Sequence, residues 1–242
     1  MKAIPRRVRS LVPMLIIASA EVSFLLGHRF LCIALHSLAI LYAVSLVLFK
    51  KEREVVAFVP VSTFRIANLS MPILFPMTIY WLTLLYASML PCLFYAVRAL
   101  DLRDLGFGSK WMYLLPVSAV VGYVFGLLDF KMYHTSSIAT NVMMSIVFSY
   151  VLVGLVEELM FRSILQTAME DRYGRWGLPI SATTFALMRL KAFPLMLLFG
   201  LILGLTFQRT RNVLLTIAMN GTATLFAFGL LPMGIGSPTF LV

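Results

Sequence analysis

Two glutamates and an arginine, Glu157, Glu158 and Arg162, lie within an apolar stretch of the chain and have types and spacing suited to chemistry. If the stretch is helical, successive residues turn by about 100°, so Glu158 and Arg162 share a face and can form an ion pair. Glu157 points elsewhere and has no such partner in its own helix. We therefore expect Glu157 to be a free, desolvated carboxylate that can act as a general base on water. From these residues alone, a buried ion-pair network that joins helices explains both glutamates equally well.

The helices that position these residues are expected to lie in a membrane. Of the 242 residues, 61% are hydrophobic and 12% are charged, and the mean hydropathy is +0.95. This charged share is about half that of soluble domains. So few charges exclude a soluble globular protein and a disordered one. The composition predicts an all-α polytopic membrane protein with about eight transmembrane helices, within a range of roughly seven to nine.

The basic residues of the chain flank its apolar runs. There are 20 Lys and Arg against 10 Asp and Glu, a net charge of +10. We interpret this excess as a determinant of membrane topology, and we expect no nucleic-acid partner. The segment 55–70 contains Pro60 and Arg65 and is either a weak span or a re-entrant piece. If it crosses, five basic patches share one side of the membrane: the N-terminus, 50–53, 98–110, 172–175 and 209–211.

Several motifs resemble those of a known family. The segment 157–166 is similar to the EExxxR signature of the CPBP family, the CAAX prenyl endopeptidase-like intramembrane proteases that are also called Abi proteins. The segment 185–189 occupies the place of the family's FxxxH motif, and 220–224 that of its HxxxN motif. The resemblance covers roughly residues 100–230. It divides the chain into N-terminal transmembrane helices (1–99), a CAAX-protease-like membrane core (100–232) and an irregular tail (233–242).

The resemblance implies roles for these positions, but the chain departs from the motifs. In the family, the first glutamate activates water, the FxxxH histidine assists it, and the HxxxN histidine and asparagine hold the oxyanion; an alternative view has some of these residues bind a metal. Glu157 is then the base, supported by Glu158 and Arg162. The three remaining positions carry Arg189, Asn220 and Thr224. Because a guanidinium cannot exchange protons as an imidazole does, we expect no bound metal and no cofactor there.

The substituted positions still leave groups that could act. Asn220 and Thr224 are four residues apart on one helical face, and both can donate hydrogen bonds to an oxyanion. Arg189 could also stabilise negative charge, or it could pair with Glu157 and weaken the base.

The resemblance thus implies a glutamate-dependent intramembrane endopeptidase. Its substrate would be a membrane-anchored or C-terminal peptide, and its site would lie within the lipid bilayer of a prokaryotic inner membrane. Two alternatives stay open: a non-catalytic pseudoprotease that binds membrane peptides or proteins, and a transporter-like protein for a small solute.

Other polar residues in or near the apolar runs have simpler interpretations. We expect Glu21 to pair with Arg29 or to reach the membrane interface, rather than to form a proton or substrate site. His36 is expected to be a hydrogen-bonded packing residue. Asp129 is assigned to a polar connector, and His134 in the same loop could approach the site from outside the motifs.

Overall fold

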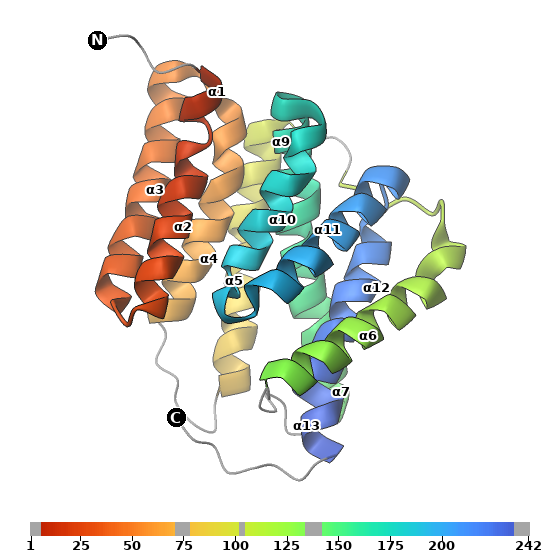
Figure 1. Cartoon of the computed structure of the whole chain (residues 1–242). Helices are drawn as coiled ribbons and strands as arrows, with labels where there is room; N and C mark the ends of the chain where they lie inside the picture. Colours follow the sequence, from red (N-terminus) through yellow and green to blue (C-terminus); the bar gives the residue numbers. More distant parts are fainter. Residues whose placement is uncertain (1–5, 71–77, 102–104, 134–141, 235–242) are drawn as a thin grey trace.

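The computed structural model describes residues 6–70, 78–101, 105–133 and 142–234, and within these ranges the regular elements are helices (Figure 1). Six described segments are long and apolar enough to cross a membrane: Arg29–Lys50, Thr83–Leu100, Met112–Tyr133, Val142–Leu187, Leu190–Thr210 and Val213–Leu230. A seventh apolar helix, α2 (Val12–Leu25), is shorter. The predicted all-α polytopic membrane fold is therefore confirmed, and the expected eight helices agree roughly with these segments.

The N-terminal part is a row of antiparallel helices. Its elements are α1 (Arg6–Arg9), α2, α3 (Arg29–Lys50), η1 (Arg53–Phe58), α4 (Val59–Ser70) and α5 (Thr78–Leu100). Helices α2 and α3 form a hairpin that turns at Gly27, whose φ of 86° is readily adopted only by glycine. In Figure 1 this hairpin lies at one side of the molecule, with α4 and α5 between it and the C-terminal helices.

The segment left open by the sequence, 55–70, runs the length of the bundle as η1 and α4. At its start, Glu52 pairs with Arg9 at 3.2 Å, close to the N-terminus of the described chain. Near its end, the carbonyl of Leu69 accepts a hydrogen bond from Arg29, at the opposite end of the α2–α3 hairpin. Since these two contacts lie at opposite ends of the hairpin, η1 and α4 together run along its full length, as a crossing segment would.

Arg65 is accommodated inside the bundle by Glu21. Its Nε and Nη2 atoms donate to the two oxygens of the Glu21 carboxylate, each at 2.7 Å. His36 adds a contact of 3.1 Å from Nε2 to Glu21 and one of 3.4 Å from Nδ1 to Ser62. The expectation that Glu21 pairs with Arg29 is therefore wrong, because Arg65 lies on the facing helix. The hydrogen-bonded packing role expected for His36 agrees with these contacts.

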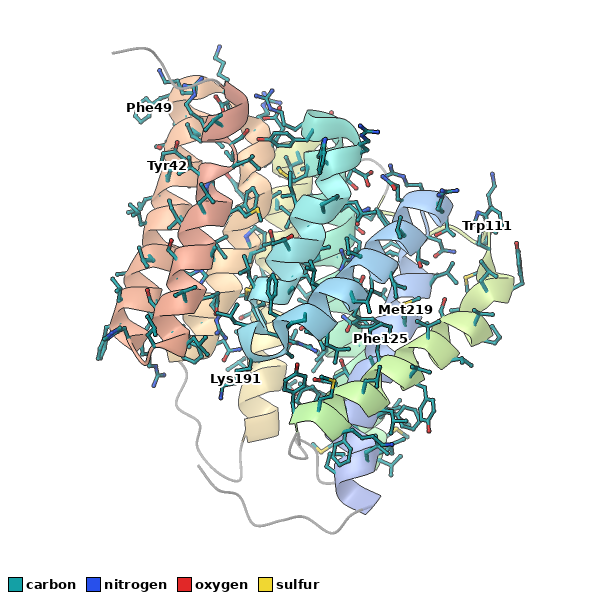
Figure 2. The ribbon with its side chains drawn as sticks, in the orientation of Figure 1. Tyr42, Phe49, Trp111, Phe125, Lys191 and Met219 are labelled. Atoms are coloured by element: carbon teal, nitrogen blue, oxygen red, sulfur yellow. The ribbon has the colours of Figure 1, made fainter. Side chains whose placement is uncertain are left out.

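The described residues of the five basic patches gather at one end of the molecule. Contacts at that end join them: Arg9 with Glu52, Arg172 with Glu54, Arg211 with Glu170, and the Val213 amide with the Gly106 carbonyl. Phe49 marks this end in Figure 2, and Lys191 marks the opposite one. The arrangement is the one that the sequence predicts if the segment 55–70 crosses.

The C-terminal part is built around one long helix. That helix comprises α7 (Val142–Ile146), η3 (Val147–Gly154), α8 (Leu155–Glu158), η4 (Leu159–Gln166) and α9 (Thr167–Tyr173), where η3 and η4 are π-helical. Around it lie η2 (Met112–Leu114), α6 (Leu115–Tyr133), η5 (Gly174–Trp176), α10 (Gly177–Leu187), η6 (Leu190–Ala192), α11 (Phe193–Thr210), α12 (Val213–Thr224), η7 (Leu225–Leu230) and α13 (Leu231–Gly234). Of the tail expected at 233–242, the first two residues end α13 and the rest lie outside the described residues.

Two glycines bring α6 directly against α12. A Cβ atom at Gly122 would overlap the carbonyl oxygen of Met219, and one at Gly126 would overlap that of Ala223. The ring of Phe125, between them, stacks on Phe199 of α11 with centroids 4.6 Å apart. This close contact, seen between Phe125 and Met219 in Figure 2, fixes the helix that carries Asn220 and Thr224.

Candidate active site

Glu158 and Arg162 form a fully buried pair on the long helix. The Arg162 Nε atom lies 3.3 Å from Glu158 Oε2, as the four-residue spacing predicts. Arg162 Nη1 also donates to the Ser181 hydroxyl of α10 at 3.4 Å, and its guanidinium lies 5.3 Å from the Phe185 ring centroid. The pair therefore joins the long helix to α10. π-helical turns lie on both sides of α8, and such turns are frequent at functional sites.

Glu157 has three partners, so the expectation of a free carboxylate is wrong. Tyr86 Oη donates to Oε1 at 2.9 Å, and Asn220 Nδ2 donates to Oε2 at 3.1 Å. Arg189 Nη2 lies 3.5 Å from Oε2. All three partners come from other helices or turns, so the residue spacing along the helix of Glu157 could not predict these contacts. Because two carboxylate oxygens can accept about four hydrogen bonds, Glu157 can still accept one from a water molecule.

Asn220 bridges the two glutamates. Its Nδ2 atom donates to Glu157 at 3.1 Å and to Glu158 at 3.0 Å, so both of its N–H groups are committed. The opposite orientation would place Oδ1 against two carboxylates and be repulsive. In this arrangement Asn220 positions the carboxylates and has no N–H left for the oxyanion role that the sequence suggested.

Thr224 lies one helical turn after Asn220 and has a hydroxyl without a hydrogen-bond partner among the described residues. The residue is 3% exposed. It lines a cavity of about 190 Å³ together with Glu157, Tyr86 and Arg189. Since buried hydroxyls normally have partners, this one points to a group that enters the cavity.

Arg189 lies in the turn after α10 and is held less firmly than Glu158 or Asn220. Besides the 3.5 Å contact with Glu157, its Nη1 atom lies 3.8 Å from the sulfur of Met196. Its side chain is 26% exposed. It lines both the cavity of Glu157 and a larger adjoining one of about 490 Å³.

All six predicted site residues thus lie in one cluster; His134, the further candidate, lies outside the described residues.

Tyr86 on α5 and Arg65 on α4 belong to the surroundings of Glu157, although the sequence analysis did not assign either to the site. The Tyr86 ring packs between Phe64 and Phe148, at centroid distances of 5.2 and 5.9 Å, which fixes its hydroxyl on Glu157. Arg65 lines the same cavity as Glu157. In the sequence, Tyr86 and Arg65 stand out only as a hydroxyl and a charge inside apolar runs, and no motif connects them with Glu157.

A cluster with metal-ligand geometry lies elsewhere in the described structure. Single ligand atoms of Glu21, Cys32 and His36 come within 4.8 Å of one another in the N-terminal helices. Both oxygens of Glu21 already accept hydrogen bonds from Arg65, so a guanidinium occupies the position that a cation would need. The donor set therefore does not favour a metal there.

Comparison with known proteins gives a match in the C-terminal part that holds Glu157 and Glu158. Residues 139–226 match the family model described as type II CAAX prenyl endopeptidase Rce1-like. The matched range includes Glu157, Glu158, Arg162, Arg189, Asn220 and Thr224. No curated protein and no solved structure gives a significant match to the chain. The membrane-spanning helices and the buried Glu157–Glu158 cluster agree with this match: residues 139–226 of the chain are similar to the type II CAAX prenyl endopeptidase Rce1-like family.

Proposed function

We propose that the chain is an intramembrane endopeptidase in which Glu157 activates water. The observation that carries this proposal is the cavity of about 190 Å³, which is lined by both Glu157 and Thr224, a residue whose hydroxyl has no hydrogen-bond partner among the described residues. The substrate we propose is a membrane-anchored or C-terminal peptide segment, and the site of action is a prokaryotic inner membrane. The family match over residues 139–226 supports the reaction class, and hydrolysis at this depth requires a protein-lined cavity that admits water.

The proposed step begins when Glu157 accepts a proton from a water molecule. The resulting hydroxide adds to the carbonyl carbon of the scissile peptide bond, and the negative charge moves to the carbonyl oxygen. Thr224 is the donor that we assign to this oxyanion. The C–N bond then breaks as Glu157 returns the proton to the leaving nitrogen, which leaves a carboxylic acid and an amine.

The other residues hold the base in place. Tyr86 and Asn220 fix the two oxygens of Glu157 from α5 and α12. Glu158 holds Asn220 in turn by accepting the second N–H of its amide, and Arg162 pairs with Glu158. Arg189 pairs with Glu157 and restrains it, since a carboxylate that shares its charge with a cation is a weaker base.

The test is the variant Glu157→Gln, which keeps the shape of the side chain and removes its ability to take a proton. With purified protein in lipid nanodiscs and membrane-peptide substrates, we expect kcat to fall by about 10²-fold or more. Asp171→Asn, the same type of change at an exposed acid outside the cavity, should leave kcat unchanged. Equal cleavage by wild type and Glu157→Gln would refute the assigned base.

A second candidate, a pseudoprotease that binds membrane peptides, is favoured by one observation. The contact between Arg189 and Glu157 places a permanent cation on the proposed base. In this case wild type and Glu157→Gln would both fail to cleave, yet both would bind the same membrane peptides. Measuring binding and cleavage on the same samples separates the two functions.

A further inference from the structure

Asp129 is a buried acid that lines the larger of the two cavities, although the sequence placed it in a connector. Helix α6 continues to Tyr133, so Asp129 lies in its last turns and is only 6% exposed. The placement in a connector is therefore wrong, because the apolar run ends before the helix does. Asp129 lines the cavity of about 490 Å³ that adjoins the one of Glu157, and Arg189 lines both.

Arg189 contacts one carboxylate and shares a cavity with another. Its Nη2 atom lies 3.5 Å from Glu157, and it lines the cavity of about 490 Å³ together with Asp129. Its contact with Glu157 is 3.5 Å, whereas Tyr86 and Asn220 reach the same carboxylate at 2.9 and 3.1 Å. A guanidinium has five N–H donors, so Arg189, with its long contacts to Glu157 and the Met196 sulfur, has donors left for a second acid.

The other charges along the larger cavity do not replace Arg189 as the partner of Asp129. Arg65 gives its Nε and Nη2 atoms to Glu21 at 2.7 Å, in a two-contact pair. Lys191 is exposed, so water screens its charge. Of the cations that line this cavity in the described structure, Arg189 is therefore the one that Asp129 shares with the proposed base.

We propose that Asp129 is a positioning residue for the peptidase reaction: it competes with Glu157 for Arg189 and so keeps Arg189 from neutralising the base. The inference rests on the proposed function for its kinetic consequence. With Asp129 charged, Arg189 is divided between two acids and Glu157 remains able to take a proton from water. Without that charge, Arg189 binds Glu157 alone and the base is weakened.

The test is a double-mutant cycle on Asp129 and Arg189, in protein reconstituted in nanodiscs. We expect Asp129→Asn to lower kcat about tenfold, with little change in KM. Asp129→Glu should restore most of the lost kcat, and Arg189→Gln should cleave faster than wild type, because the cation that restrains Glu157 is gone. In the Arg189→Gln background, Asp129→Asn should have no further effect. An equal loss from Asp129→Asn in both backgrounds, or a loss of kcat in Arg189→Gln alone, would overturn the proposal.

A second readout does not require activity. An apolar carbodiimide reacts with carboxyl groups, and an ion pair protects them, so mass spectrometry of the labelled protein reports how firmly Arg189 holds Glu157. Labelling of Glu157 should fall several-fold in Asp129→Asn, rise in Arg189→Gln, and equal the Arg189→Gln level in the double variant. If Glu157→Gln cleaves as wild type does, the proposed function fails but this labelling pattern still tests the competition. Unchanged labelling in Asp129→Asn would overturn it.

Discussion

At the scale of single residues, each arginine buried in the bundle depends on one glutamate. Arg162 pairs with Glu158 on its own helix, whereas Arg65 pairs with Glu21 across two helices. Both glutamates are at most 1% exposed. Removing one partner of such a pair leaves an uncompensated charge at membrane depth, and this penalty exceeds the net contribution of the pair itself.

The Glu158–Arg162 pair therefore supports a prediction on stability. Arg162→Met should lower the free energy of unfolding by about 3–5 kcal/mol, because Glu158 then has no cation. The double variant Glu158→Gln with Arg162→Met should recover a large part of this loss. Denaturant unfolding of the detergent-solubilised protein measures all three forms.

An exposed pair is the control. Arg211 pairs with Glu170 at 2.6 Å, but its side chain is 51% exposed, so Arg211→Met should change stability by about 1 kcal/mol or less. If Arg162→Met has an equally small effect, the buried pair is not the structural support inferred for it.

The same residues show which contacts of the site could be predicted from the sequence. The Glu158–Arg162 contact follows from helical spacing alone, and α12 places Asn220 and Thr224 on one face. The partners of Glu157 could not be inferred in this way. Tyr86 lies 71 residues away in sequence, and Asn220 lies 63 residues away. Such contacts depend on how helices pack, which hydrophobic patterns do not specify.

At the scale of elements, the packing of α6 on α12 decides where the proposed oxyanion donor lies. Gly122 and Gly126 allow the two backbones to meet, and Thr224 follows directly on Ala223, against which Gly126 packs. The sequence did not single out these glycines, because a glycine in an apolar run gives no sign of which helix it contacts. The sequence left the path of segment 55–70 open for a similar reason: the charge of Arg65 argued against a span, and only the structure shows Glu21 beside it.

The glycine contact gives a prediction for this element pair. Gly122→Ala should lower the free energy of unfolding by about 1–3 kcal/mol, since the new methyl group overlaps the Met219 carbonyl and α6 must move away from α12. Gly108→Ala is the matched control, because a Cβ atom there meets nothing within 4 Å. We also expect slower peptide cleavage in Gly122→Ala, as Thr224 shifts with its helix. Equal stability of the two variants would show that the contact is not close-packed.

At the scale of the whole molecule, the charges and the cavities lie toward opposite ends. Of the Lys and Arg that the structure describes, most belong to the patches of one end. The cavity of about 490 Å³ is lined by Leu25 at the end of α2, Tyr133 at the end of α6 and Lys191 in the turn before α11. Because Lys and Arg are retained on the cytoplasmic side, the basic end should face the cytoplasm and this cavity should be reached from the other side.

Cysteine labelling in whole cells tests this orientation. In a variant with Cys32 and Cys92 replaced by Ala, Lys191→Cys should react with a membrane-impermeant thiol reagent in intact cells. Arg175→Cys, exposed at the basic end, should react only after the cells are permeabilised. Because Lys191 lines the larger cavity, its accessibility also reports the side from which a peptide reaches Arg189 and Glu157. The reverse pattern would place the basic end outside and would mean that a peptide enters from the cytoplasm.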